Sequence, residues 1–100
     1  MDTQQLKRDL WAELQDRLVG DRRRVYDAFM RYGPATTRRI AELIPMDLLT
    51  VRPRTTELFQ DGLLEMIDRD GHEGVYAAVR IQDAVRRAEH QARPKQMMLL

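Results

Sequence analysis

The most informative stretch of the sequence spans residues 50–64 and reads TVRPRTTELFQDGLL. Thr50 is placed to cap a helix that reaches Gln60, because a threonine oxygen accepts hydrogen bonds from the unpaired amides at a helix N-terminus. Pro53 then falls in the first turn, where its missing amide proton costs little. Gly62 is expected to end the helix, since glycine readily adopts the left-handed conformation found there. The stretch therefore predicts a helix with a sharp stop that leads directly into an apolar run.

The periodicity of the sequence changes after this helix. Two short runs, Leu63–Asp68 and Val75–Arg80, are typical of β-strands. Residues 69–74 lie between them and read RDGHEG, a polar connection with two glycines. Such a connection predicts a hairpin loop between two antiparallel strands.

Two helices are expected between residue 21 and Pro45. The longer one is capped by Asp21, ends before Gly33-Pro34, and has an inner stripe of Val25, Ala28, Phe29 and Tyr32. The shorter one is capped by Thr36 or Thr37 and runs through Ile44, where Pro45 closes it.

An amphipathic helix is expected on each side of this region. The first spans residues 3–19, with Thr3 as a cap, Gly20 as a stop and apolar residues at three- and four-residue spacing. The last spans residue 81 to about 91 and is expected to end before Pro94. We therefore divide the chain into residues 1–20, a helix for possible dimerisation; 21–80, the central domain; 81–93, the C-terminal helix; and 94–100, a flexible tail.

The order helix, short helix, tight turn, helix and hairpin is that of a winged helix-turn-helix. Residues 21–80 resemble the winged-helix superfamily, particularly the small DNA-binding proteins of bacteria and their phages. The motifs that carry the resemblance are Gly33-Pro34-Ala35-Thr36-Thr37, Ile40-Ala41-Glu42-Leu43, Val51-Arg52-Pro53-Arg54 and Glu57-Leu58-Phe59-Gln60-Asp61-Gly62-Leu63-Leu64. The resemblance implies a mainly helical α+β fold with a two-stranded wing, flanked by the N-terminal and C-terminal helices. It also implies double-stranded DNA as a partner, although winged helices serve as protein-interaction modules too.

The net charge of +1 conceals a dipolar chain. Fifteen of the seventeen basic residues are arginine, the side chain best suited to bidentate phosphate contacts. Residues 20–60 carry eight arginines and five acidic residues, a net charge of +3, whereas residues 61–80 carry two arginines and five acidic residues, a net charge of −3. Any contact with nucleic acid should therefore fall in the middle of the chain.

Candidate DNA contacts follow from the resemblance and from the charge pattern. The exposed start of the recognition helix is expected to place Arg52, Arg54, Thr55 and Thr56 in the major groove. Further contacts to the DNA backbone are expected from Arg38, Arg39, Arg22, Arg23 and Arg24. The alternative is that these arginines form a solvated face, or pair with Asp27, Glu42 and Glu57.

The expected wing departs from the family pattern because it is acidic. It offers Arg69 among Asp68, Asp70 and Glu73, with His72 beside them. Acidic groups repel phosphates, so we expect this wing to stay off the DNA or to contact protein. A second hypothesis follows, in which the chain is a protein-interaction adaptor or inhibitor.

The apolar stripe of the first helix is a candidate dimerisation surface. Its residues are Leu6, Leu10, Trp11, Leu14 and Leu18. A two-fold homodimer through this stripe would set the spacing of two recognition helices. The stripe could equally pack onto the core of the same chain, and the two interpretations can coexist.

The last five residues resemble the pentapeptide with which bacterial polymerases and repair proteins bind the sliding clamp. A glutamine, Gln96, leads Met97 and Met98, and the terminal pair Leu99-Leu100 would fill an apolar pocket. That motif usually ends in phenylalanine, so Leu100 is a departure. A chance match and a tail that folds back on the core are the alternatives.

Several classes of function have little support in the sequence. There is no cysteine and no serine, which removes disulfides, thiolate metal sites and the commonest nucleophiles. Asp68, Asp70, His72 and Glu73 lack the spacing of a calcium loop and fit a solvated turn better, and His90 stands by itself. No apolar run approaches the roughly 20 residues of a membrane span. We therefore expect a cytoplasmic protein that is not an enzyme and needs no metal or cofactor.

Overall fold

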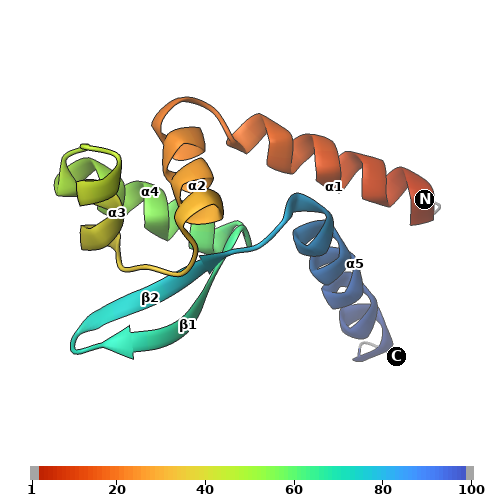
Figure 1. The fold of residues 1–100 in the computed structure, drawn as a ribbon. Coiled ribbons are helices and arrows are strands. Elements are labelled where there is room, and N and C mark those ends of the chain that lie inside the picture. The colour runs from red at the N-terminus through yellow and green to blue at the C-terminus, as the bar shows by residue number, and fades with distance from the viewer. Residues whose placement is uncertain (1–2, 99–100) are drawn as a thin grey trace.

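The computed structural model describes residues 3–98, and the side chains of residues 3–91. Five helices and one antiparallel pair of strands follow one another along this part of the chain (Figure 1). They are α1 (Thr3–Arg17), α2 (Gly20–Tyr32), α3 (Thr37–Leu43), α4 (Leu48–Gln60), β1 (Leu64–Asp70), β2 (Glu73–Ala78) and α5 (Ile81–Met98). This order confirms the predicted mainly helical α+β fold, a winged-helix-like arrangement with α1 and α5 as its flanking helices.

The core lies where α2, α3, α4 and the start of the hairpin meet. Its most deeply buried side chains are Val25, Phe29, Ile40, Val51, Thr55, Leu58 and Leu63. Tyr26 is also buried, and its hydroxyl donates a hydrogen bond of 2.8 Å to the carbonyl oxygen of Val79. The expected place of Tyr32 on the inner stripe of α2 is wrong. It lies in the last turn, beyond the core, and its exposed ring lies 5.5 Å from the guanidinium of Arg31.

The central helix, α4, begins earlier than expected. Its N-cap is Asp47, whose Oδ1 accepts a hydrogen bond of 2.8 Å from the amide of Leu49. The prediction of Thr50 as the cap is therefore wrong, because the aspartate three residues before it satisfies the helix end first. Pro53 consequently lies in the second turn, where it cannot donate to the carbonyl of Leu49.

The end of α4 confirms the role predicted for Gly62. Its φ is +80°, and its amide donates to the carbonyl of Phe59 over 3.1 Å. The next amide, that of Leu63, donates to the carbonyl of Leu58 over 2.9 Å. These two bonds form a Schellman motif, which normally brings together two apolar side chains. Leu58 and Leu63 are both fully buried, so the motif fixes where the hairpin leaves the helix.

Among the other predicted helix ends, the cap of α3 and the end of α2 at Gly33 are right, whereas the end of α1 and the start of α2 are wrong. Thr36 caps α3 by accepting a hydrogen bond from the amide of Arg39 over 3.1 Å. Helix α1 ends at Arg17, before Gly20, and α2 begins at Gly20 itself, with a φ of +57°. Asp21 therefore lies in the first turn of α2 and does not cap it.

The hairpin is longer and its turn tighter than predicted. Asp70 pairs with Glu73, so the turn consists of Gly71 and His72 alone, and Gly71 has the positive φ of +65° that favours glycine. Next to the turn, the residues of β1 are exposed to solvent on both faces, whereas all residues of β2 are half-buried. One extra residue in β1, Ile67, forms a bulge.

Helix α5 continues through Pro94 to Met98, so the predicted break and the tail expected from residue 94 are wrong as far as the structure describes the chain. Proline removes one helical hydrogen bond, and the residues that follow it are good helix formers. Helices α1 and α5 pack against each other beside the hairpin and the α2–α4 cluster (Figure 1).

Candidate nucleic-acid interface

The face of α4 that points away from the core carries Arg52 and Thr56. Both side chains are exposed, as the prediction for a recognition helix requires. Thr55, in contrast, is buried, and its hydroxyl donates a hydrogen bond of 2.9 Å to the carbonyl of Val51. The predicted exposure of Thr55 at the start of the recognition helix is therefore wrong. Thr55 lies on the same stripe as Val51 and Leu58, which face the core.

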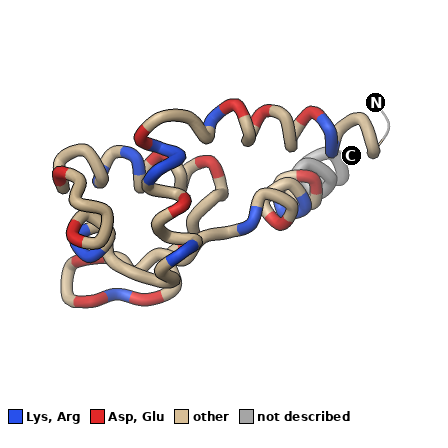
Figure 2. Tube along the Cα trace, turned by 45° about the horizontal axis from the view of Figure 1, so that its top comes forward, with Lys and Arg blue, Asp and Glu red and all other residues tan. Residues whose placement is uncertain are grey.

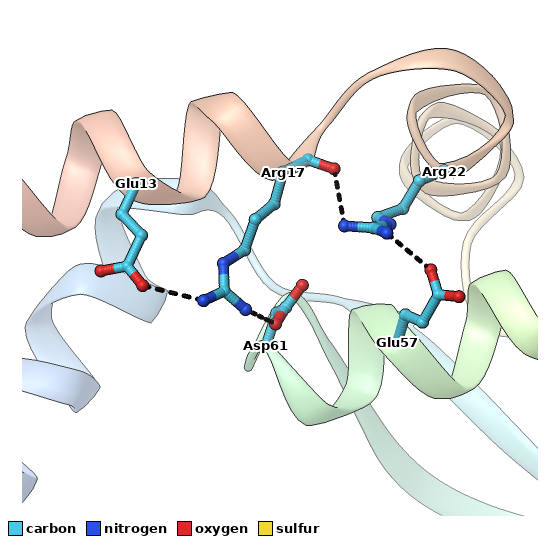
Figure 3. A network of polar contacts seen from close by, with 5 residues as sticks. All are labelled: Glu13, Arg17, Arg22, Glu57 and Asp61. Atoms are coloured by element: carbon cyan, nitrogen blue, oxygen red, sulfur yellow. Dashed lines mark hydrogen bonds and ion pairs between the residues drawn. The ribbon is translucent and has the colours of Figure 1, made fainter.

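Arg54 points to the opposite side of α4, toward α2. Its Nη2 lies 2.6 Å from Oε1 of Glu57, and the pair is only about one-third exposed. Glu57 also forms an ion pair with Arg22 of α2, with 2.8 Å between Nη2 and Oε2. Arg22 in turn donates to the carbonyl of Arg17 at the end of α1, over 3.2 Å (Figure 3). This geometry does not favour Arg54 in the groove, because Arg54 is paired with Glu57 within α4, nor Arg22 on the DNA backbone, because Arg22 joins α2 to α4 and α1.

A second ion-pair cluster ties α1 to the end of α4. The guanidinium of Arg17 binds Asp61 and also lies 2.8 Å from Glu13 (Figure 3). The hydrogen bond and the negative charge of Asp61 raise the pKa of Arg17. The contact spans 44 residues of sequence, so no local pattern predicted it. Together the two clusters hold α4 in place relative to α1 and α2.

Three other candidate arginines form ion pairs within their own helices. Arg23 pairs with Asp27 over 3.1 Å, Arg24 with Asp21 over 3.8 Å, and Arg39 with Glu42 over 3.2 Å. Together with the two ion pairs of Glu57, these pairs place an arginine beside Asp27, Glu42 and Glu57. These are the three carboxylates expected to pair with arginines if the arginines do not bind DNA. All three pairs are well exposed, and exposed pairs contribute only about 0–1 kcal/mol. These arginines therefore remain able to exchange a carboxylate for a phosphate.

Arg38 connects α3 to the hairpin. Its Nε lies 3.2 Å from Oε1 of Glu73, the residue that follows the hairpin turn. Along the hairpin tip a basic residue, Arg69, lies between two acidic ones, Asp68 and Asp70, so this part of the fold does not present a basic surface (Figure 2). Sequence reasoning named Glu73 only as a source of repulsion, whereas the structure shows that it neutralises a candidate DNA contact.

A cleft of about 270 Å³ lies between α4 and the hairpin, at the start of α3. Its lining is polar apart from one ring and comprises Thr37, Arg52, Thr55, Thr56, His72, Glu73, Gly74 and Tyr76. The side chain of Arg52 forms no ion pair with any residue that the structure describes. Its guanidinium offers hydrogen-bond donors suited to a phosphate or to the edge of a base, whereas the hydroxyls of Thr55 and Thr56 donate to the carbonyls of Val51 and Arg52 within α4.

The structure buries most of the predicted dimerisation stripe within the chain. Leu14 and Leu18 belong to the core, Leu10 packs against it, and Leu6 is half-buried. Only Trp11 is well exposed, at 41%. Three of the five residues therefore serve intramolecular packing, one of the two interpretations of this stripe.

The predicted docking tail lies largely beyond what the structure describes. Gln96 and Met97 are in the last turns of α5, with side chains outside the described part of the chain. Leu99 and Leu100 lie outside the described residues altogether. Within residues 3–98, no helix is long and apolar enough to cross a membrane. The described side chains also contain no group of three or more His, Cys, Asp or Glu residues that could hold a metal ion.

Comparison with known proteins supports the fold and leaves the function open. No family model matches the chain, and no curated protein matches it. The chain is similar to a structure described as the crystal structure of RV1404 from Mycobacterium tuberculosis, with a TM-score of 0.61 and 14% sequence identity. The likeness covers 93% of this chain, which spans 65% of the length of that one. At this identity the likeness concerns the fold alone.

Proposed function

We propose that the chain is a winged-helix protein that binds double-stranded DNA with the exposed face of α4. In this proposal it acts in the cytoplasm as a dimeric transcriptional regulator or as an accessory protein of phage replication or recombination. The observation that carries the proposal is Arg52, an exposed arginine without an ion pair among the described residues, which lines the cleft beside the hairpin. Arg52 and Thr56 would read the major groove, where arginine pairs bidentately with guanine.

Contacts to the DNA backbone would come from the exposed arginines on either side of the cleft. Arg38 and Arg39 lie in the first turn of α3, and their ion pairs with carboxylates, each of 3.2 Å, are open to solvent. Phosphate is a strong bidentate partner for arginine, so it can replace such carboxylates. Arg22 and Arg54 are not part of this proposed surface, because both are part-buried and paired with Glu57.

A dimer would compensate for the small number of contacts that one copy offers. Trp11 is the exposed apolar residue of α1, and a large exposed aromatic ring is typical of interaction surfaces. Pairing two copies through Trp11 on α1 would double the number of phosphate contacts per complex.

The test compares Arg52→Ala with Arg86→Ala in a fluorescence anisotropy titration of labelled duplex DNA. Arg86 is the matched control, because it is a well-exposed arginine on α5, away from the proposed surface. Loss of a good base contact lowers affinity by about 1–3 kcal/mol, or about five- to 150-fold. We expect that loss for Arg52→Ala and wild-type affinity for Arg86→Ala. Equal effects of the two substitutions would contradict the proposed surface.

A second candidate function is that of a protein-interaction adaptor or inhibitor, favoured by the acidic hairpin. Met66 and Ile67 are exposed there, close to Asp68 and Asp70. The C-terminal segment, which resembles a sliding-clamp-binding motif, would offer a further contact to a protein. This alternative predicts that the wild-type chain does not bind duplex DNA even at about 50 mM salt, where phosphate contacts are strongest.

A further inference from the structure

The side of α4 that faces the hairpin carries an aromatic ring beside the candidate DNA contacts. Phe59 lies seven residues after Arg52 and three after Thr56, so the three residues share one helical stripe. Phe59 is 45% exposed, although its ring makes an edge contact with Tyr76, with 5.8 Å between the ring centroids. This stripe therefore brings together a cation without an ion pair, a hydroxyl and an accessible aromatic ring.

The hairpin adds two side chains to this surface. Met66 stands opposite Tyr76 in the strand register and is itself exposed. Both side chains lie over Gly74, where a Cβ atom would come within 3.0 Å of the Tyr76 ring and 3.1 Å of the Met66 methyl group. Glycine at this position therefore allows both to lie against the strand. We call Phe59, Tyr76 and Met66 the aromatic platform.

The platform is held in place before any ligand binds. Two backbone hydrogen bonds, of 3.0 and 2.9 Å, join Tyr76 to Ala35. On the core side the Tyr76 ring meets Phe29 edge-on, with 6.4 Å between centroids. A ring fixed in this way loses little conformational freedom when a planar group stacks nearby.

We propose that the aromatic platform stacks an unpaired nucleobase while Arg52 contacts the adjoining phosphate. The ligand class is then DNA with a single-stranded extension, and not uninterrupted duplex alone. Base faces stack on exposed aromatic side chains of proteins that bind single strands. In an intact duplex those faces are covered by neighbouring base pairs, and the groove edges are largely polar.

Charge complementarity favours this ligand over an apolar protein segment. The platform adjoins the cleft lined by Arg52, and the nearby carboxylate of Glu73 is neutralised by Arg38 at 3.2 Å. A phosphate linked to the stacked base would thus contact the guanidinium of Arg52, which forms no ion pair with a described carboxylate. The inference rests on the proposed DNA binding and extends it by naming the form of DNA.

The test uses the full chain and two labelled DNA probes, a blunt duplex and the same duplex with a single-stranded extension. The variants are Phe59→Ala and Phe59→Leu, with Leu49→Ala as the control. Leu49 is more exposed than Phe59 and lies ten residues before it in the same helix, which places it about 15 Å away along the helix axis and outside the aromatic platform. Stacking of one base corresponds to about a five- to 150-fold difference in affinity. We expect the wild type to prefer the extended probe by a factor in this range.

Phe59→Ala should abolish the preference and leave blunt-duplex affinity unchanged, Phe59→Leu should reduce the preference, and Leu49→Ala should retain it. A 2-aminopurine base in the extension adds a direct reading, since its fluorescence is quenched when it stacks. Quenching by the wild type and not by Phe59→Ala is the expected result. Equal affinity of the wild type for both probes, or a preference that is retained in Phe59→Ala, would contradict base stacking on the platform. Neither result would contradict the proposed binding of duplex DNA. Binding to neither probe would overturn the proposed function itself.

Discussion

Replacing Glu73 by Gln should strengthen DNA binding, because it releases Arg38 and removes a negative charge from the cleft. The two side chains form one ion pair of 3.2 Å, and they are 57% and 31% exposed. Exposed pairs are worth up to about 1 kcal/mol, and DNA must break this one to use Arg38. Its prior removal should therefore raise affinity by about two- to fivefold, which corresponds to about 0.5–1 kcal/mol.

Fluorescence anisotropy at low and at physiological salt measures this gain, which should shrink as salt screens the charges. The control is Asp70→Asn, which removes a charge from the residue paired with Glu73 across the hairpin without releasing Arg38. A gain no larger than that of Asp70→Asn would refute the role assigned to the pair.

Four further substitutions test the fold that positions the site. Tyr26→Phe leaves the buried carbonyl of Val79 without its 2.8 Å hydrogen bond and should cost about 1–3 kcal/mol of unfolding free energy, measured by urea denaturation. Burial raises the pKa of Tyr26 above its ordinary value of 10.0. The stabilisation that the protonated hydroxyl gives the wild type is therefore complete below about pH 10 and should decrease as the pH rises above that value. Tyr26→Phe should not show this decrease in stability at high pH. Asp47→Ala should cost about 0.5–2 kcal/mol in the same assay, whereas Thr50→Ala should cost clearly less; the reverse order would restore Thr50 as the cap. Gly62→Ala forces a residue with a Cβ to a φ of +80°, which should cost about 1–2 kcal/mol of unfolding free energy and lower the melting temperature. An unchanged melting temperature would argue against the Schellman motif at the end of α4.

Features set by neighbouring residues were predictable from the sequence. The stop at Gly62 and the cap at Thr36 depend on one backbone conformation and one side-chain oxygen, so the local sequence contains the needed information. The wrong choice of Thr50 over Asp47 arose between two residues of similar capping ability, only three positions apart. The break expected at Pro94 failed because one proline does not outweigh a run of good helix formers.

The candidate site was harder to predict, because it depends on contacts between distant elements. Thr55 could have been placed correctly, since its spacing from Val51 and Leu58 puts it on the buried stripe of α4. The seven-residue spacing between Arg52 and Phe59 could likewise have shown that both lie on one stripe of the helix. The orientation of Arg54 depends on Arg22 and Glu57 together, and the Arg38–Glu73 contact spans 35 residues of sequence. Such pairings follow only from the packed structure.

The central claim, that this chain binds duplex DNA through arginine contacts to phosphates, is tested most directly by the salt dependence of the wild-type affinity. Each phosphate contact contributes about −0.9 to the slope of log K against log salt concentration. The two phosphate contacts from Arg38 and Arg39 predict a slope of about −2 for one protomer and about −4 for a dimer. A slope near zero, or no binding at about 50 mM salt, would contradict the claim.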